Sequence, residues 1–259
     1  MLVIVEENHS LAQMQSGMPY LFSLAKQYAY ADNHTATTHP SEPNYLALIA
    51  GSTMGDEGDH NPAWQTSGSS VFGQAVAAGR SAKTYAESMT SSCQQSDSGP
   101  YKVKHNPWAS FRDERASCQA GDVPMGTPSS GAMHDDVASG NLPNVGMAVP
   151  NVCNDAHDCS LGTADSWLRS WLVPIMAGLD FQSGRLAVIV TADEDDRNSG
   201  NKVLTVVIHR NSPARVVSAA LNHYSLAGLY SDVTGTSRLR NATTAPGFAA
   251  AFGLQVGPN

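Results

Sequence analysis

The chain has 259 residues, 41% of them hydrophobic, and carries a formal net charge of −8. No basic stripe interrupts this acidic balance, which argues against nucleic acid as a partner, because phosphate backbones are held by clustered Lys and Arg. No apolar run approaches the roughly 20 residues that a bilayer span needs, so we expect no stable membrane anchor.

Apolar segments of strand length alternate with segments of helical spacing along the chain. The first, MLVIV, is a continuous apolar run, which is typical of a strand covered on both faces. Similar patterns predict strands at 1–5, 81–86, 144–149, 185–193 and 203–209, and helices at 20–29, 42–50, 70–79, 164–178 and 222–233. Helices between apolar strands predict an α/β fold, a three-layer α/β/α sandwich with a mostly parallel central sheet.

One large domain accommodates these elements, because 259 residues suffice for a single substantial core. Residues 87–142 differ from the rest, since they are rich in Ser, Gly, Asp and Pro and hold two of the four cysteines. We therefore predict a single domain over residues 1–259, with a disulfide-tied, loop-rich excursion at about 87–142.

The four cysteines pair most simply as two disulfides, Cys93 with Cys118 and Cys153 with Cys159. The spacing in CNDAHDC does not fit the C-x2-C of a zinc ribbon, and four reduced core cysteines are the alternative. Two disulfides would indicate an oxidising compartment. We therefore expect a secreted or extracytoplasmic protein, whose leader is absent from a chain in which Met1 opens the first strand.

Four polar clusters lie where sites form in parallel sheets, beyond the carboxyl ends of strands or at the entry to a helix. They are EENH at 6–9, TTHPSEPNY at 37–45, PNVCNDAHD at 150–158 and TADEDD at 191–196. Because each cluster offers oxygen or imidazole ligands, we expect the four to share one site.

Ser41 stands directly before a predicted helix, in which Pro43 suits the first turn. The free N–H groups and the dipole at a helix N-terminus favour a nearby anion such as a phosphate. A serine in this position is also a good N-cap, whose hydroxyl would simply bind the backbone of its own helix. The residues of this segment alone allow both interpretations.

The segment HPSEPNYLALIAG, with ENHS after the first strand and DE after a later one, resembles the bacterial phosphoesterase family. That family includes acid phosphatases and non-specific phospholipases C, and it belongs to the alkaline phosphatase superfamily. The resemblance covers nearly the whole chain, because ENHS, HPSEPN, KHNPW, PNVCNDAHD, VIVTADED and NHYS occur in the family's order. It implies an alkaline-phosphatase-like sandwich.

The resemblance also implies a set of functional residues. Ser41 would be the nucleophile that forms a phosphoserine, and Asn44 would contact a phosphate oxygen. The implied metal ligands are Glu7, Asn8, Ser41, Asp193 and Glu194. Oxygen ligands suit a hard divalent ion, so we favour Mg²⁺ or Ca²⁺ over Zn²⁺ or Mn²⁺.

One stretch departs from the two-zinc members of the superfamily. Where those proteins carry an Asp and a His as ligands of a second metal, this chain has Asn151 and Asp155. Neutral Asn is a poor substitute for a charged ligand, so we expect one divalent metal ion. His157 is then the candidate general acid for the leaving group. His223 lies where a metal-binding His would be, and we expect it to contact the phosphate, although each imidazole also fits a purely structural role.

Three further residues are candidates for substrate binding. His39 lies two residues before Ser41, while Lys104 and His105 belong to the KHNPW motif. Lys104 would offer positive charge to the phosphate. Each of the three fits an ordinary loop position equally well.

The first functional hypothesis is a metal-dependent phosphomonoesterase of the acid phosphatase type, acting on a small phosphorylated substrate through a phosphoserine at Ser41. The alternative is a phospholipase C-type phosphodiesterase acting on lipid headgroups; the compact chain favours the phosphatase. A non-catalytic binding domain is the third hypothesis, which the presence of Ser41, Asn44, Glu7 and Asp193 disfavours. The leaving group, the pH optimum and the oligomeric state are not indicated by the sequence.

Overall fold

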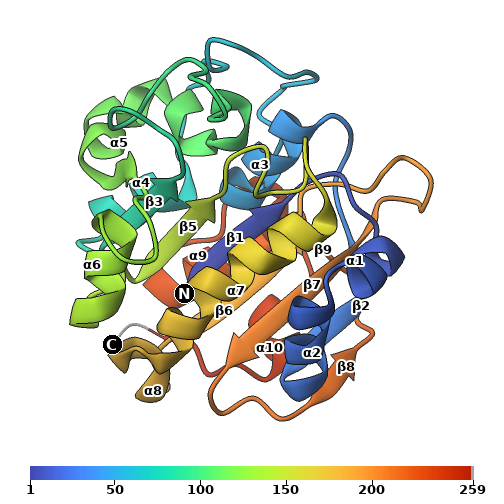
Figure 1. The fold of residues 1–259 in the computed structure, drawn as a ribbon. Helices are drawn as coiled ribbons and strands as arrows, with labels where there is room; N and C mark the ends of the chain where they lie inside the picture. Colours follow the sequence, from blue (N-terminus) through green and yellow to red (C-terminus); the bar gives the residue numbers. More distant parts are fainter. Residues whose placement is uncertain (258–259) are drawn as a thin grey trace.

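A computed structural model describes residues 1–257, which form a nine-stranded sheet with helices on both faces (Figure 1). The strands are β1 (Leu2–Glu6), β2 (Ala29–Thr35), β3 (Ala82–Ala86), β4 (Asp122–Pro124), β5 (Val145–Val149), β6 (Ala187–Ala192), β7 (Lys202–His209), β8 (Arg215–Val217) and β9 (Leu221–Asn222). Their order is β4-β3-β5-β1-β6-β7-β2-β8, with β9 beside β2, and only β7 runs antiparallel to its neighbours among the pairs described. The predicted α/β fold with a mostly parallel sheet is confirmed.

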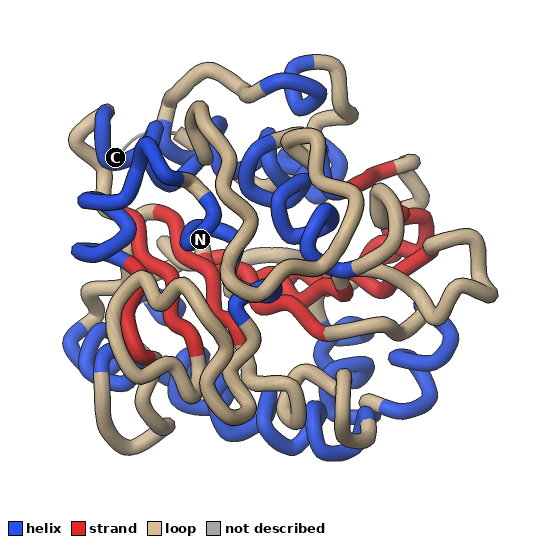
Figure 2. Tube along the Cα trace, turned by 90° about the horizontal axis from the view of Figure 1, so that it is seen from above, coloured by secondary structure: helices blue, strands red, loops and turns tan. Residues whose placement is uncertain are grey.

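Helices cover the two faces of the sheet in separate groups, as the view from above shows (Figure 2). One face carries α3 (Ser41–Ala50), α4 (Val71–Ala77), α5 (Arg115–Gly121), α9 (His223–Thr234) and α10 (Phe248–Phe252). The other carries α1 (Leu11–Gly17), α2 (Pro19–Gln27), α6 (Ala132–Ser139), α7 (Leu161–Ala177) and α8 (Leu179–Gln182). Short 3-10 turns lie at Val103–His105, Pro107–Ser110, Arg112–Glu114 and Arg240–Thr243.

The continuous apolar run at the N-terminus follows from the central position of β1 between β5 and β6. Val3 and Val5 pack into the core on the α3 side, while Leu2 and Ile4 pack into the core on the α7 side. A strand buried on both faces needs apolar residues at every position, because successive side chains alternate between the two faces.

Two of the predicted segments differ in the structure, and α1, β8 and α10 lie where no element was predicted. The helix predicted at 20–29 ends at Gln27, and β2 begins at Ala29. The sequence AYADNHT gives no clear strand pattern, because polar residues occupy its last four positions. Residues 87–142 are not merely a loop-rich excursion, since they contain α5, α6 and the edge strand β4, whose three residues are too few for a visible alternation.

Both predicted disulfides, Cys93–Cys118 and Cys153–Cys159, are present. They are compatible with an extracytoplasmic protein. Among the helices of residues 1–257, none has the length and apolar character that crossing a bilayer requires.

Helix α3, which carries Ser41 in its first turn, ends at Gly51 in the left-handed conformation, with φ of 65°. The Gly51 N–H donates to the carbonyl of Ala47, and its carbonyl accepts from the N–H of Asn241. A side chain at Gly51 would collide with the backbone carbonyl oxygen of Leu239. The close approach of two backbones at this point therefore requires glycine.

We predict that Gly51→Ala lowers the free energy of unfolding by more than about 2 kcal/mol, since left-handed strain and a backbone clash add together. Gly79→Ala is the matched control, because Gly79 has φ of 72° but no atom within 4 Å of an added Cβ. The control should cost only about 1 kcal/mol, the strain alone. Urea unfolding of both variants measures this difference, and equal losses would contradict the role given to the clash.

Glu6 is the last residue of β1, and its side chain lies on the α7 side of the sheet without a hydrogen-bond partner. The side chain is fully buried, and neither carboxylate oxygen has a hydrogen-bond partner. Burial raises the pKa of Glu6 well above its usual value, and the nearby charges of Asp155 and Asp165 raise it further. The carboxyl group of Glu6 is therefore expected to be protonated in the folded protein.

We predict that Glu6→Gln stabilises the protein at neutral pH by roughly 1–3 kcal/mol. A raised folded-state pKa means that the wild-type carboxyl contributes its full stability only below its unfolded pKa of about 4.3, and loses it as the pH rises towards the folded pKa. The stabilisation by Gln should therefore shrink towards acidic pH. Denaturant unfolding between pH 4 and pH 8 tests this, with exposed Glu57→Gln as control. A gain independent of pH would contradict it.

Candidate active site

The carboxyl ends of β1 and β6 bring two acids together. The strands are parallel neighbours in which Glu6 lies opposite Ala192, so the following residues, Glu7 and Asp193, leave the sheet side by side. The backbone is fixed there, because the Asp193 N–H donates to the Glu6 carbonyl at 3.0 Å and the Asn8 N–H donates to Asp193 Oδ1 at 2.9 Å. Both side chains lie on the sheet face that α3 covers.

Ser41 turns its hydroxyl to this pair. Its Oγ donates to Glu7 Oε2 at 2.9 Å, and the residue is 2% exposed. The alternative interpretation of Ser41 as an N-cap is wrong. Pro40 is the N-cap residue, no side chain caps the helix, and Ser41 is the first helical residue. The hydroxyl is thus free of its own helix and directed at a carboxylate.

Glu7 and Asp193 are fully buried, and each keeps one oxygen, Oε1 and Oδ2 respectively, without a hydrogen-bond partner. Burial raises the pKa of Glu7 well above its usual value, with Asp193 as the next cause. Burial and the charge of Glu194 raise the pKa of Asp193 to about 7. Two neighbouring buried acids with unpaired oxygens require protons or a cation between them. Their oxygen chemistry fits the predicted divalent metal ion.

The other predicted ligands lie beside these two. Asn8, with φ of 57°, donates from Nδ2 to Glu7 Oε2 at 3.1 Å. Glu194 is 3% exposed, and burial raises its pKa to about 7. All five residues predicted to bind metal therefore come from the ends of β1 and β6 and the start of α3.

Asn44 is occupied by the loop that leads into α3. Its Oδ1 accepts from the N–H groups of Thr37 and Thr38, and its Nδ2 donates to Glu194 Oε2 at 3.0 Å. Nδ2 also lies within hydrogen-bond distance of the carbonyls of Thr38 and Pro40. The Asn44 amide thus holds the backbone of the loop that precedes Ser41. Contact of Asn44 with a phosphate stays a prediction, and it would require one of these hydrogen bonds to be replaced by a bond to phosphate.

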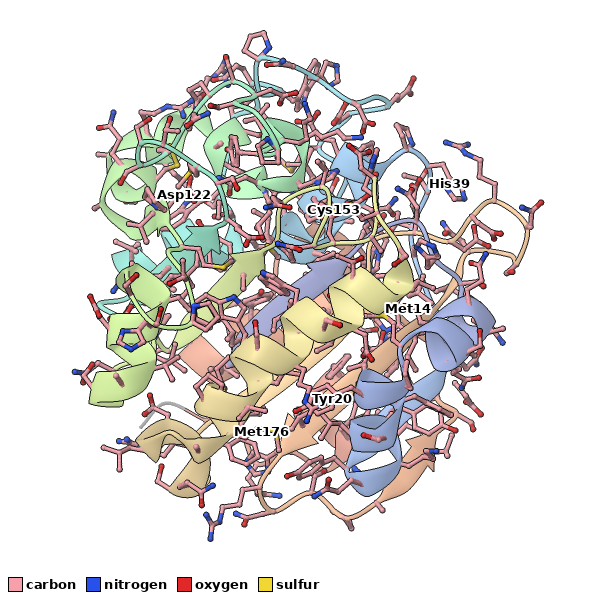
Figure 3. All side chains as sticks on the ribbon, in the orientation of Figure 1. Met14, Tyr20, His39, Asp122, Cys153 and Met176 are labelled. Carbon is pink, nitrogen blue, oxygen red and sulfur yellow. A yellow bond between two sulfur atoms is a disulfide. The ribbon has the colours of Figure 1, made fainter. Side chains whose placement is uncertain are left out.

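His39 lies beside the loop between β6 and β7, as Figure 3 shows. Its Nδ1 is 3.0 Å from Glu194 Oε2, and its Nε2 is 3.4 Å from Asp195 Oδ1. Partial burial and the charge of Arg197 lower the pKa of His39. The structure therefore places His39 against the predicted ligand Glu194, with 21% of its side chain exposed at the rim of the site.

His105 is a buried residue next to Glu7. Its Nδ1 is 3.1 Å from Asp155 Oδ2, its Nε2 is 3.2 Å from Glu7 Oε1, and its ring stacks on Tyr45. Burial, with Lys104 as the next cause, lowers the pKa of His105 well below its usual value. A neutral ring that donates to Asp155 turns a lone pair towards Glu7. At 1% exposure, His105 is placed to hold Glu7 and Asp155, and this position does not favour the predicted contact with substrate.

His157 and Lys104 lie on the open side of the site. The His157 side chain is 30% exposed, and its Nε2 is 3.4 Å from Lys104 Nζ. Glu7, His105 and His157 each offer a ligand atom within 4.8 Å of the others. Two imidazole rings that could bind a metal therefore lie near Glu7, whereas the sequence predicts only oxygen ligands.

Asp59 occupies the N-terminus of α3, an arrangement that sequence reasoning missed. Its Oδ1 accepts from the backbone N–H of Glu42 at 3.0 Å, and its Oδ2 accepts from Lys104 Nζ at 2.8 Å. These hydrogen bonds lower the pKa of Asp59 despite its partial burial. A carboxylate thus binds the two groups, a helix N–H and a lysine, that would attract a phosphate.

Asn151 does not reach the other ligands. Its Oδ1 accepts from the N–H groups of Cys153 and Asn154, and its Nδ2 donates to Ser88 Oγ at 3.1 Å. It shapes the loop that contains Cys153, labelled in Figure 3. Asp155 uses both oxygens, one towards His105 and one for the N–H of His157. The expectation of a single metal ion stays a prediction.

His223 does not face a substrate pocket. The residue is fully buried, its Nε2 lies 2.6 Å from the Asp193 carbonyl oxygen, and its Nδ1 lies 3.2 Å from Nε2 of His34. Burial lowers the pKa of His223 to about 4. Both ring nitrogens are therefore engaged, and the expected contact of His223 with phosphate is replaced by a contact with the backbone of a predicted ligand.

Two clusters outside this set also contain candidate ligands. Glu42, Asp56 and His60 lie close together, where Glu42 Oε2 accepts from the N–H and Nδ1 of His60. The sequence offers no signal for this contact beyond the acidic loop GDEGDH. The third group contains Cys93 and Cys118, whose disulfide removes the thiolates that a metal would need.

Comparisons with known proteins place the sequence in a family. The sequence model of the phosphoesterase family matches residues 12–227. The chain is 30% identical, over 95% of its length and 80% of the relative's, to a phosphatidylinositol-3-phosphatase of Mycobacterium tuberculosis. It is also 30% identical to an acid phosphatase of Aspergillus fumigatus, over 71% of this chain but only 42% of that protein.

Solved structures share the fold at low sequence identity. A protein of the alkaline phosphatase superfamily from Vibrio parahaemolyticus superposes with a TM-score of 0.62 at 11% identity, covering 93% of this chain and 69% of that one. The zinc-bound periplasmic domain of EcEptC from Escherichia coli gives 0.56 at 10% identity, covering 95% and 86%. The family match over residues 12–227 and the relative that is 30% identical over 95% of this chain show that the chain belongs to the phosphoesterase family and is a phosphoric ester hydrolase.

Proposed function

We propose that this chain is a metal-dependent phosphomonoesterase that works through a phosphoserine at Ser41. The observation that carries the proposal is the position of the Ser41 hydroxyl, which starts a helix, binds Glu7 at 2.9 Å and adjoins two buried acids with unpaired oxygens. The helix N-terminus attracts the phosphoryl group, while the acids provide a site for a cation.

Substrate binding is proposed to begin with an exchange of anions. Phosphoryl oxygens would replace the Asp59 carboxylate at the Glu42 N–H and at Lys104 Nζ, the two groups that Asp59 now occupies. The replacement places the phosphorus next to Ser41, because Glu42 follows it directly in α3. Lys104 would then neutralise part of the phosphate charge.

In the first step, Ser41 Oγ attacks phosphorus in line with the leaving oxygen, so that an O–P bond forms as the ester O–P bond breaks. Glu7 orients the hydroxyl and accepts its proton, since Oε2 already accepts the hydrogen bond. A divalent cation held by Glu7, Asn8, Asp193 and Glu194 would supply charge that favours ionisation of Ser41 and offsets the phosphoryl charge.

The leaving alkoxide needs a proton, and His157 is the proposed donor. Its partial exposure and its position beside Lys104 place it at the open side, where the alcohol departs. In the second step a water attacks the phosphorus of the phosphoserine and His157 accepts the proton of that water. The Ser41 Oγ–P bond breaks as Glu7 returns its proton to Ser41 Oγ, which releases phosphate and regenerates the hydroxyl.

The proposed substrate class rests on the names of two relatives. Two of those compared carry the names acid phosphatase and phosphatidylinositol-3-phosphatase, and both names describe cleavage of phosphate monoesters. We therefore propose a small phosphorylated substrate and extracytoplasmic action. The phospholipase C-type alternative would require room for a second ester substituent on the phosphorus.

We predict that the enzyme cleaves p-nitrophenyl phosphate much faster than bis(p-nitrophenyl) phosphate. Ser41→Ala should lower kcat/KM for the monoester by at least about 10³-fold, because the nucleophile is lost. Ser166→Ala, an exposed serine of α7, is the control and should keep wild-type activity. Faster cleavage of the diester would favour the phospholipase C-type alternative, and unchanged activity of Ser41→Ala would refute the proposed nucleophile.

We also predict that the chelator-treated protein gains thermal stability when a divalent cation is added. At a hundredfold excess over Kd, binding to the folded state is worth about 2.7 kcal/mol. Asp193→Asn should abolish this gain, although the metal-free variant should melt at a higher temperature than the metal-free wild type, since one of two repelling acids is gone. Scanning calorimetry with Mg²⁺, Ca²⁺, Mn²⁺ and Zn²⁺ measures both effects.

The control for this experiment is Asp59→Asn, which removes a carboxylate that Lys104 already neutralises. It should retain the rise in Tm on addition of metal. A full metal-induced rise in Asp193→Asn would contradict the proposed ligand set.

A further inference from the structure

A chain of hydrogen bonds links β2 to the backbone of Asp193. His34 of β2 and His223, the first residue of α9, are both fully buried, and their ring centroids are 5.4 Å apart. His34 Nε2 lies 3.2 Å from His223 Nδ1, and His223 Nε2 lies 2.6 Å from the Asp193 carbonyl oxygen. The pairing of β2 with β9, which leads directly into α9, brings the two rings together.

The last hydrogen bond of this series, to the Asp193 carbonyl, fixes which ring nitrogen of each histidine carries a hydrogen. A carbonyl oxygen only accepts hydrogen bonds, so His223 must carry its hydrogen on Nε2. In the neutral ring, His223 Nδ1 is then a lone pair, and His34 must donate to it from Nε2. The remaining nitrogen, His34 Nδ1, is a lone pair that is buried without a partner. Both rings are thus held as the Nε2–H tautomer.

Asp193 is consequently clamped on both sides of its α-carbon. Its N–H donates to the Glu6 carbonyl at 3.0 Å, and its C=O accepts from His223 at 2.6 Å. With both peptide planes fixed, the direction of the Asp193 side chain follows from its χ angles alone. The peptide plane between Asp193 and Glu194 also sets the starting point of the Glu194 side chain.

We propose that His34 is a positioning residue, which orients the carboxylates of Asp193 and Glu194 by holding His223 in a single tautomer. The proposal deepens the proposed function and rests on it. Removing the donor at His34 would leave His223 Nδ1 buried and unpaired, which favours rotation of the ring and release of the Asp193 carbonyl. His34 is too deeply buried to touch a substrate, so its effect would pass entirely through His223.

Nitrogen NMR of the wild-type protein tests the tautomers without any measurement of catalysis. We expect long-range ¹H–¹⁵N spectra to show both rings in the Nε2–H form, each with a slowly exchanging Nε2–H proton, assigned with His34→Gln and His223→Asn. An Nδ1–H form of either ring, or rapid exchange between tautomers, would overturn the proposal even if the protein is an active phosphatase.

Two substitutions of similar volume separate positioning from packing. His34→Leu fills the space without a hydrogen-bond donor, whereas His34→Gln offers an N–H group to His223 Nδ1. We expect His34→Leu to lower kcat on p-nitrophenyl phosphate by about tenfold or more, with KM changed by less than about twofold, and His34→Gln to restore most of the loss.

Equal activity of the Leu and Gln variants, whether both high or both low, would overturn the positioning role. Matching near-UV circular dichroism of the two variants confirms that both fold. Absence of phosphatase activity in the wild type would refute the proposed function instead, while the NMR result would still decide whether the His34–His223 chain exists.

Discussion

The constraint on which the site depends is the adjacency of two buried carboxylates. Glu7 and Asp193 lie side by side because β1 and β6 are parallel and in register, with Glu6 opposite Ala192. Backbone hydrogen bonds prevent them from separating, and burial prevents water from screening them. A folded chain tolerates this arrangement only with protons or a cation between the acids, which links the fold of the sheet to the chemistry of the site.

Three other parts of the structure contact Glu7 and Asp193. Helix α3 brings the hydroxyl of Ser41 to Glu7, His105 lies between Glu7 and Asp155, and His223 holds the backbone of Asp193. Each supporting group is buried and neutral or paired, while Lys104 lies at the open side in an ion pair with Asp59. An acidic interior with a partly exposed lysine at its open side suits the capture of a phosphate ester, because the positive charge attracts the approaching anion.

Much of this could be predicted from the sequence, and the reason is local patterning. The apolar run of β1 and the ordered motifs predicted the central strand, the sandwich and the grouping of Glu7, Ser41 and Asp193. What escaped prediction depends on contacts between distant residues: His34 meets His223 across 189 positions, and Asp59 meets Lys104 across 45. No periodicity encodes such pairs. Even Ser41 was ambiguous, since a nucleophile and an N-cap look alike until the hydroxyl's partner is known.

Covalent transfer of phosphate to Ser41 is the step on which the proposed function depends. The most direct measurement is mass spectrometry of the peptide that contains Ser41, after rapid acid quenching of the enzyme during turnover of p-nitrophenyl phosphate. We expect an increase by the mass of one phosphoryl group, located on Ser41. A phosphoryl group on another side chain, or continued turnover with no modified peptide at any quench time, would contradict it.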